Sequence, residues 1–466
     1  MIKALKSMYN TVRQCVRYKN KRSPLITSEA GVKQGDPSSS LLFLFFVNDM
    51  INTMNADIDG IFTLEEIRFF LIMFADDSIL FGNTPQALQS LLNDLEQYCQ
   101  ISGLKINTGK NKILIFEKGR HTRHSFSLCN KELEIVDSFK YLGTYFFKNG
   151  SWNRTQKLIS QHSKFALHNL FIVFNQLDLD IKEKCKLFDS LVGSILNYNA
   201  AIWGNHDSKS IEIVHCKFLR KVLSVKKSTN LSALYGETGR YPMKIQRQLI
   251  MIKYWIKLVK TPDSLTYNVY KMLKHDADLN ISYSGMNWAF YIKNLLTSSG
   301  LRYIWDNQWN TEIINYEQIK LRILDIYKQT WYADINNSNR LETYNLYKHD
   351  FNLEKYLSCI KENKFRIALT RFRLSSHDLA IETGRYTNID RKFRICTHCN
   401  MRVIENEYHF LIVCPKYITI RQKYLKPYFF RWPTLNKFTN LMTNTSTNAI
   451  NNLAKYIYFS MQERRS

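Results

Sequence analysis

Two short patterns in the sequence carry residue types that bind metal ions. The first is FADDSILFG at residues 74–82, where Asp76 and Asp77 stand between two apolar runs. Adjacent side chains of a strand point to opposite faces, so neighbouring carboxylates converge on one site only where the chain turns. Mg²⁺ prefers oxygen ligands, and a two-metal site stabilises both oxygens of a phosphoryl transfer. The pattern suits a Mg²⁺ site, although aspartate is also common in plain turns.

The second pattern is CTHCNMRVIENEYHFLIVC at residues 396–414, with the spacing C-x2-C-x9-H-x4-C. Its Cys396, Cys399, His409 and Cys414 can close a tetrahedral Zn²⁺ site with no open position, which is typical of structural zinc. We therefore expect structural Zn²⁺ here, with unmetallated thiols as the alternative and His398 as a bystander. The six other cysteines are scattered singly, which indicates reduced thiols rather than a disulfide framework.

The aspartate pair lies in a part of the sequence that alternates between strand and helix patterns. The evenly apolar segment 67–82 predicts a strand, a tight turn and a second strand. Residues 84–103 have leucines at helical spacing, a Thr-Pro start and a glycine stop, so we expect a helix. Three further elements are expected: a buried helix at 41–54, a strand pair at 104–116, and a hairpin at 138–152 that turns at Asn149-Gly150.

The chain becomes almost wholly helical in pattern after Trp152. Apolar residues at helical spacing recur through 153–275, while basic residues such as Lys217 lie outside the stripe and suit either nucleic acid or a solvated face. Residues 276–360 show irregular helical stretches without a chemical motif. The Asn/Thr-rich stretch within 431–466 predicts a linker before a short terminal helix.

The overall charge favours nucleic acid as a partner. The chain has 65 Lys and Arg against 40 Asp and Glu, a formal charge of +25. Such an excess needs counter-anions, and polyphosphate is the commonest large one, although a ribosome-associated or merely solubilising surface is the alternative. The sequence shows no signal-peptide pattern and no apolar run of the ~20 residues that span a bilayer, so we expect an intracellular protein without membrane contact.

Four stretches occur in an order that resembles the palm of reverse transcriptases of the non-LTR retrotransposon (LINE) group. They are GVKQGDPSSSLLFLFFVNDM at 31–50, FADD at 74–77, GLKINTGKNKILIF at 103–116 and FKYLGTYF at 139–146. They look like that family's motifs B, C, D and E. The stretch LVGSILNYNAAIWG at 191–204 looks like part of the family's thumb, and EYHFLIVCP at 407–415 looks like its downstream zinc-binding segment.

The resemblance implies an RNA-directed DNA polymerase with an RNA template, a DNA primer and a two-metal Mg²⁺ site. Asp76 and Asp77 would then be metal-binding carboxylates. Gln34 and Gly35 would meet the incoming nucleotide and template, and Lys110 would neutralise or protonate the leaving pyrophosphate. The implied primer grip comprises Tyr141, Leu142 and Gly143.

The family's third carboxylate, on the motif A strand upstream of motif B, has no counterpart here. The segment before Gly35 contains no aspartate, and Glu29 is its only acidic residue. We therefore expect a chain that begins downstream of motif A, lacks the fingers and does not synthesise DNA alone. Without that strand, the 67–82 hairpin should have an unpaired apolar edge, which favours association or aggregation.

A basic segment precedes the cysteine pattern. In KFRIALTRFR at 364–373, Phe365, Leu369 and Phe372 lie at helical spacing, which favours a core position over base stacking. Arg366, Arg371 and Arg373 are candidates for contacts with nucleic-acid phosphates.

The predicted fold class is α+β: a partial polymerase palm with an antiparallel sheet and helices, then a mainly α-helical thumb and connection, then a small zinc-binding module. The expected segments are the palm at 1–137, the primer-grip hairpin and thumb at 138–275, the connection at 276–380, the CCHC segment at 381–430, and the linker with a terminal helix at 431–466. The alternative function is a non-catalytic RNA- or DNA-binding remnant, and the oligomeric state stays open.

Overall fold

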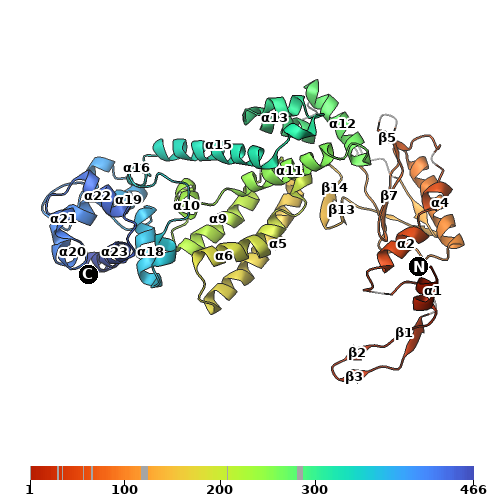
Figure 1. Cartoon of the computed structure of the whole chain (residues 1–466), viewed down its shortest axis with the longest axis horizontal. Helices are drawn as coiled ribbons and strands as arrows, with labels where there is room; N and C mark the ends of the chain where they lie inside the picture. The colour runs from red at the N-terminus through yellow and green to blue at the C-terminus, as the bar shows by residue number, and fades with distance from the viewer. Residues whose placement is uncertain are drawn as a thin grey trace. The chain divides into compact units, whose positions relative to one another are not determined.

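The structure is a computed structural model that describes residues 2–28, 31–33, 35–55, 57–64, 67–116, 124–206, 208–280 and 287–465. The chain divides into two compact units. The N-terminal unit comprises Met1–Tyr141 and Phe147–Gly150, and the helical unit comprises Leu142–Phe146 and Ser151–Ser466. Figure 1 shows strands mixed with helices in the first unit and helices almost throughout the second. The α+β prediction is confirmed.

The N-terminal unit contains short strands around a few helices. Its helices are α1 (Ile2–Tyr9), α2 (Ser39–Phe46), α3 (Met50–Thr53) and α4 (Pro85–Ile101). Its strands are β1 (Val12–Gln14), β2 (Arg17–Tyr18), β3 (Lys21–Arg22), β4 (Ile26–Ser28), β5 (Phe62–Leu64), β6 (Ile67–Phe69), β7 (Leu71–Phe74), β8 (Asp77–Leu80), β9 (Lys112–Ile113), β10 (Ser127–Leu128), β11 (Lys131–Glu132), β12 (Glu134–Ile135) and β13 (Ser138–Tyr141).

Helix α4 anchors the core of the N-terminal unit. The Thr84 side chain caps its start by accepting a hydrogen bond from the Ala87 amide at 3.2 Å, and Pro85 fits the first turn. Leu91 and Leu95 are buried against Met50 and neighbouring apolar side chains. Burying a leucine fully stabilises a fold by about 1.5–3 kcal/mol, so this stripe holds the helix in place. The predicted helix and strand–turn–strand are both confirmed.

Two predictions for the N-terminal unit are wrong in detail. The segment 41–54 forms two helices, α2 and α3, and most of α2 is exposed, while its Phe43 packs against the same apolar cluster as Met50 of α3. Within 104–116 the structure has one strand, β9, instead of a strand pair. β9 pairs in parallel with β12, Lys112 opposite Glu134 and Ile113 opposite Ile135, so its partner comes from later in the chain.

The helical unit begins with strand β14 (Thr144–Phe147), whose last residue belongs to the N-terminal unit. Its first helices are α5 (Trp152–Gln176), α6 (Ile181–Phe188), the π-helix η1 (Asp189–Gly193), α7 (Ser194–Leu196), α8 (Ala200–Trp203), α9 (Lys209–Leu223), α10 (Leu231–Thr238), α11 (Met243–Val259), α12 (Leu265–Asp278), α13 (Trp288–Ser298), α14 (Arg302–Asp306) and the 3-10 helix η2 (Thr311–Ile313).

The chain continues with α15 (Tyr316–Asn336), α16 (Glu342–Asn345), α17 (Tyr356–Cys359), α18 (Asn363–Arg373), α19 (Ala380–Tyr386), η3 (Arg391–Phe393), the π-helix η4 (His409–Val413), η5 (Pro415–Tyr417), α20 (Ile418–Tyr424), α21 (Pro427–Phe430), α22 (Leu435–Met442) and α23 (Thr447–Arg465). Two apolar clusters form the core of this unit. One of them reaches from Leu167 on α5 to Ile457 on α23, so the C-terminal helix is part of the same core. Within the described residues, no helix is long and apolar enough to cross a membrane.

Two further predictions need correction. The hairpin expected at 138–152 turns at Leu142 and Gly143, where both φ angles are positive (45° and 81°), instead of at Asn149-Gly150. Two successive positive φ angles are what a two-residue hairpin turn of type I′ requires. The predicted linker after residue 431 contains α22, because Phe438 and Leu441 are buried. The terminal helix has 19 residues and is therefore longer than expected.

Candidate active site and metal cluster

Asp76 and Asp77 lie at the tip of the β7–β8 hairpin. The strands pair antiparallel with Phe74 opposite Asp77, which leaves Ala75 and Asp76 as the two-residue turn. Ala75 has a φ of 55°, a conformation that non-glycine residues adopt at a cost of about 1–2 kcal/mol. Both aspartates are exposed. The turn therefore presents two adjacent carboxylates to solvent, as a Mg²⁺ site at a strand tip requires.

The β7–β8 pair forms a two-stranded sheet among the described residues. Ile72 and Phe74 on β7 are 39% and 61% exposed. The hairpin that bears the aspartates thus has apolar side chains open to solvent. The unpaired apolar edge expected from the sequence stays a prediction.

Tyr141 lies within electrostatic reach of Asp77. Burial raises the pKa of the Tyr141 phenol, and the negative charge of Asp77 raises it further. The Tyr141 hydroxyl oxygen is buried and has no hydrogen-bond partner among the described residues. The start of the predicted primer grip is thus close to the aspartate pair within the N-terminal unit.

Of the residues predicted to meet the nucleotide, the template or the pyrophosphate, the structure describes Gly35 and Lys110. Gly35 has a φ of 84° with nothing within 4 Å of a hypothetical Cβ, so its role there is conformational freedom. The Gln34 prediction falls outside the described residues. Lys110 is exposed in a turn closed by its amide and the Asn107 carbonyl at 3.1 Å. No ion pair joins Lys110 to either aspartate in the described part of the chain, so the structure does not bring them together.

Leu142 and Gly143 are held by Tyr198 and Asn199, two residues that sequence analysis did not select as site residues. The Tyr198 hydroxyl donates a hydrogen bond to the Leu142 carbonyl at 2.9 Å, and the Asn199 amide donates one to the Thr144 hydroxyl at 2.6 Å. A Cβ on Gly143 would lie 2.8 Å from the Tyr198 ring. The signal was available in the quoted stretch NYNAAIWG, because Asn is the non-glycine residue best suited to a positive φ, and Asn199 has a φ of 52°.

The four predicted zinc ligands come together in the helical unit. The ligand atoms of Cys396, Cys399, His409 and Cys414 all lie within 4.8 Å of one another. The Cys399 Sγ and His409 Nε2 atoms are 3.5 Å apart. Bond lengths of about 2.3 Å for Zn–S and 2.0 Å for Zn–N place ligand atoms of a tetrahedron roughly 3.5–3.8 Å apart, so the cluster fits zinc after a small contraction.

Local backbone structure explains why these four side chains converge. The Cys396 amide donates to the Val403 carbonyl at 2.8 Å, which closes a loop around Cys399 with Arg402 at a φ of 51°. The π-helix η4 then carries His409, and the Cys414 amide donates to the His409 carbonyl at 2.7 Å. Burial, together with the neighbouring Cys396 and Cys399, raises the pKa of the Cys414 thiol to about 12, so the free thiol resists ionisation.

A buried arginine supports the segment that carries two of the ligands. Arg421 on α20 donates from Nε to the Leu411 carbonyl at 3.0 Å and from Nη2 to the Cys414 carbonyl at 2.9 Å. The Tyr456 hydroxyl of α23 donates to the Phe410 carbonyl at 2.9 Å. A π-helix leaves main-chain carbonyls without helical partners, and these side chains satisfy them.

The three candidate phosphate-binding arginines have different environments. Arg371 is exposed and donates to the Ser224 carbonyl at 2.7 Å. Arg366 is half-buried and donates to the Asn363 side chain at 2.9 Å. The expectation for Arg373 is wrong, since this residue is buried and ion-paired. The aromatics of α18 lie in the core, as expected.

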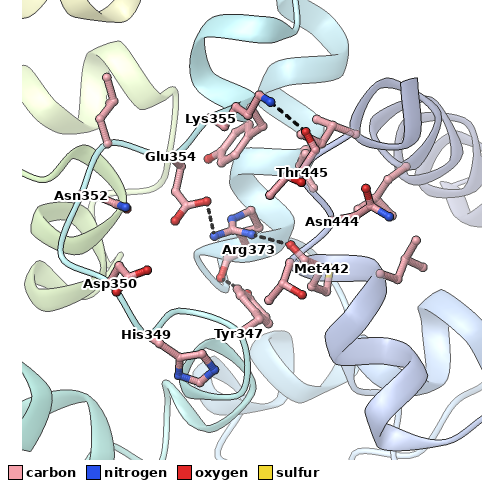
Figure 2. Close-up of a pocket in the computed structure, with 17 residues that line it drawn as sticks. Tyr347, His349, Asp350, Asn352, Glu354, Lys355, Arg373, Met442, Asn444 and Thr445 are labelled. Atoms are coloured by element: carbon pink, nitrogen blue, oxygen red, sulfur yellow. Dashed lines mark hydrogen bonds and ion pairs between the residues drawn. The ribbon is translucent and has the colours of Figure 1, made fainter. Parts of the chain in front are cut away.

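Arg373 belongs to a charge network beside a pocket of about 280 Å³. Its Nε lies 2.6 Å from a Glu237 carboxylate oxygen, and its Nη2 lies 3.0 Å from Glu354. Figure 2 shows its guanidinium between Glu354 and the Met442 carbonyl. Protein groups therefore satisfy Arg373, and a nucleic-acid phosphate cannot reach it without breaking these ion pairs.

Comparison with known proteins identifies the N-terminal part of the chain. Residues 2–146 match the family described as reverse transcriptase (RNA-dependent DNA polymerase). The Pol polyprotein of the type-2 retrotransposable element R2DM of Drosophila melanogaster is 32% identical over 130 residues, which are 26% of this chain and 12% of that protein. The RNA-directed DNA polymerase from the mobile element jockey of Drosophila funebris is 26% identical over 214 residues, 43% of this chain and 22% of that protein.

Residues 2–146 form a reverse transcriptase domain, and the similar fly proteins come from retrotransposable or mobile elements.

A transposon-derived protein of Caenorhabditis elegans is also similar, with 29% identity over 160 residues. These residues are 33% of this chain and 56% of the worm protein, so the chain spans about half of that relative and less of the two fly proteins. The reverse transcriptase domain contains the aspartate hairpin, Gly35, Lys110 and the Tyr141–Gly143 turn. The metal cluster lies outside it, in the helical unit.

Proposed function

We propose that the chain belongs to an RNA-directed DNA polymerase of a non-LTR retrotransposon, which acts on an RNA template and a DNA primer. The observation that carries the proposal is the Asp76–Asp77 pair at an exposed hairpin tip beside Tyr141, within a reverse transcriptase domain. Adjacent exposed carboxylates at a turn supply the oxygen ligands that Mg²⁺ prefers.

Each candidate residue has a role that its chemistry allows. Asp76 and Asp77 would hold Mg²⁺, which supplies charge stabilisation to the attacking and leaving oxygens. Gly35 would give the nucleotide close access to the backbone, and the exposed Lys110 would bring a cation to the leaving pyrophosphate. Tyr141 would contact the primer end, where its buried and unpartnered hydroxyl offers a hydrogen bond.

We propose that the described residues supply no third carboxylate to this site. Among them, Cys396, Cys399, His409 and Cys414 form a group of side chains close enough to hold one metal ion, and no such group includes Asp76 or Asp77. Because Mg²⁺ strongly prefers a nearly complete octahedron, we propose that the chain alone does not catalyse polymerisation. This observation also favours the second candidate function, a non-catalytic nucleic-acid-binding protein.

Primer extension on an RNA template tests whether the described residues are sufficient for polymerisation. The chain is incubated with template, primer, nucleotides and Mg²⁺ or Mn²⁺, and with the Asp76→Ala variant as the control. The proposal expects no incorporation by the chain alone. Template-dependent incorporation that disappears in Asp76→Ala would show that the described residues already contain a sufficient metal site.

Helix α5 supports the nucleic-acid partner. It has 25 residues and no acidic side chain. Its exposed residues include Lys157, Gln161, Lys164 and His168, which recur at helical spacing and so share one face. Phe165 beside them is 74% exposed. A basic helix face with an exposed aromatic suits the phosphate backbone and bases of a polynucleotide.

A salt series tests this face of α5. We expect log K for a primer–template to fall linearly with log salt concentration, and Lys157→Gln with Lys164→Gln to reduce the slope by about two. The matched control is Lys253→Gln with Lys257→Gln, which removes the same charge from exposed positions of α11. A flat salt dependence of the unaltered chain would exclude a phosphate-dominated interface. Arg366 and Arg371 stay candidates for further phosphate contacts and can be substituted in the same assay.

The metal cluster has a structural role in this proposal. Cys396, Cys399, His409 and Cys414 would fill all four positions of a Zn²⁺ ion and leave none for a substrate. Metal analysis should find one zinc per chain, lost in Cys414→Ser and retained in Cys15→Ser, whose exposed cysteine lies elsewhere in the chain. Equal zinc content in the two variants would contradict this assignment.

A further inference from the structure

The N-terminal unit carries a hairpin that the proposed site does not use. Residues Val12–Ser28, the basic hairpin, include strands β1 to β4. β1 pairs antiparallel with β4, and β2 pairs antiparallel with β3. In Figure 1 this hairpin extends away from α1 and α2. Almost all of its residues are exposed, so its side chains are available to a partner.

All charged side chains of the basic hairpin are positive. Within 17 residues it has no aspartate or glutamate, while its basic residues are Arg13, Arg17, Lys19, Lys21 and Arg22. In the described part of the chain, none of these five side chains is within ion-pair distance of a carboxylate. The local positive charge is therefore not neutralised by the described residues.

The strand register places two of these charges directly opposite each other. Arg17 pairs with Arg22 across β2 and β3, so both side chains leave the ribbon on the same face. Like charges at directly opposed positions destabilise a strand pair. The arrangement thus costs stability in the isolated protein, and an anionic partner that contacts both guanidinium groups removes this cost.

The opposite face of the ribbon offers an aromatic side chain. Tyr18 pairs with Lys21, and its ring is 72% exposed. The Lys19 ammonium lies 5.5 Å from the centre of the Tyr18 ring. An exposed aromatic surrounded by cations suits a base stacked above a phosphate backbone. A two-stranded ribbon is also narrow enough for the major groove of B-form DNA.

We propose that the basic hairpin is a second nucleic-acid contact, separate from the aspartate hairpin and from α5. Arg13, Arg17, Lys21 and Arg22 bind backbone phosphates, and Tyr18 stacks on an unpaired base where one is present. The choice of a polynucleotide over another polyanion rests on the proposed polymerase function. An anionic membrane surface, which the exposed Leu25 and Ile26 would also suit, is the competing partner.

The test measures binding of the full chain to a labelled DNA duplex, a single strand of equal length and an RNA–DNA hybrid over a salt series. The hairpin variant combines Arg13→Gln, Arg17→Gln, Lys21→Gln and Arg22→Gln. The matched control combines Lys253→Gln, Lys257→Gln, Lys260→Gln and Lys361→Gln, four exposed cations of the helical unit. The quantity compared is the slope of log K for the duplex against log salt concentration. We expect the hairpin variant to reduce the size of this slope by about three to four, and the control variant to reduce it by less than about one. Tyr18→Ala should weaken single-strand binding by about fivefold or more.

The outcomes separate this inference from the function on which it rests. Equal salt slopes for the hairpin and control variants would overturn the inference while leaving salt-dependent binding by the chain intact. Weak, salt-independent binding by the unaltered chain would overturn the nucleic-acid function and the inference together. Loss of binding to phosphatidylserine vesicles without any change in nucleic-acid binding would assign the basic hairpin to a membrane surface instead. Unchanged thermal melting of both variants establishes that they fold.

Discussion

The side-chain hydroxyl of Tyr198 donates a hydrogen bond to the main-chain carbonyl of Leu142 at 2.9 Å. The Trp203 indole in turn donates to the Tyr198 carbonyl at 2.9 Å, and Trp203 is fully buried. The turn that carries the implied primer grip is therefore fixed to the core of the helical unit by residues more than fifty positions away. Tyr198 and Asn199 are positioning residues for that turn.

Gly143→Ala should loosen this attachment. The φ of 81° is strained for alanine, and the new Cβ would lie 2.8 Å from the Tyr198 ring, which must move and give up its hydrogen bond. We expect the free energy of local opening for residues 144–147, measured by amide hydrogen exchange, to fall by about 2 kcal/mol. Gly150→Ala is the matched control, because Gly150 also has a positive φ (65°) but nothing lies within 4 Å of its Cβ position. Equal effects of the two substitutions would contradict the role of Tyr198.

Arg421→Met should weaken zinc binding without removing a ligand. The substitution leaves the Leu411 and Cys414 carbonyls without the donors that hold the ligand segment. Loss of such outer contacts typically costs about 10–100-fold in metal affinity, and competition with a chromophoric chelator measures it. Lys423→Met, an exposed change on the same helix, should leave the affinity unchanged. If both variants retained the original affinity, Arg421 would have no part in holding the cluster.

Arg373→Met should destabilise the helical unit strongly. It leaves Glu237, which has no exposed surface, without its cation at 2.6 Å. Removing one partner of a buried pair costs about 3–5 kcal/mol, measurable as lost hydrogen-exchange protection of α18. Arg371→Met, at an exposed position two residues earlier, should change stability by at most about 0.5 kcal/mol. Adding Glu237→Gln to Arg373→Met should recover part of the loss. No recovery would mean that the buried carboxylate is not the cause.

The same network predicts an acid dependence of stability. Burial alone would raise the pKa of Glu354, but the charges of Arg373 and Lys348 outweigh it and hold this pKa below its usual 4.5. A depressed folded pKa adds stability above the unfolded pKa, which is lost as pH falls through the folded value. The melting temperature should therefore fall below about pH 4.5. The Glu354→Gln variant should be less stable than the unaltered chain at pH 7. This difference in stability should shrink as the pH falls below about 4.5. A constant difference from pH 7 to pH 3 would contradict the assignment.

The sequence was most informative where residue type and spacing act locally. The strand–turn–strand around Asp76, helix α4 with its Thr84 cap and the four ligands of the metal cluster were all predicted, because each depends on short-range geometry. The β9–β12 pair was missed, since its partner strand lies about twenty residues away. The turn at Leu142-Gly143 was misplaced because Asn149-Gly150 is the stronger local turn signal, and only the contact with Tyr198 shows why the chain turns earlier.

Charge gave the least reliable residue assignments. Arg371 and Arg373 are two positions apart on α18, yet one is exposed and the other is buried between two glutamates. Glu237 comes from α10, so no pattern within 364–373 could reveal the pairing. A basic cluster in a sequence therefore indicates a partner class more securely than it indicates the contacting residues.

Binding of Mn²⁺ is the sharpest test of the metal site proposed at Asp76 and Asp77. Mn²⁺ is titrated into the chain with an RNA–DNA primer–template and a nucleoside triphosphate, whose phosphates supply further oxygen ligands, and bound Mn²⁺ is followed by electron paramagnetic resonance. We expect a Mn²⁺ site that is lost in Asp76→Asn and in Asp77→Asn. It should be retained in Asp59→Asn, because Asp59 is an exposed aspartate elsewhere in the same unit. Identical titrations for the unaltered chain and all three variants would show that Asp76 and Asp77 do not bind the metal.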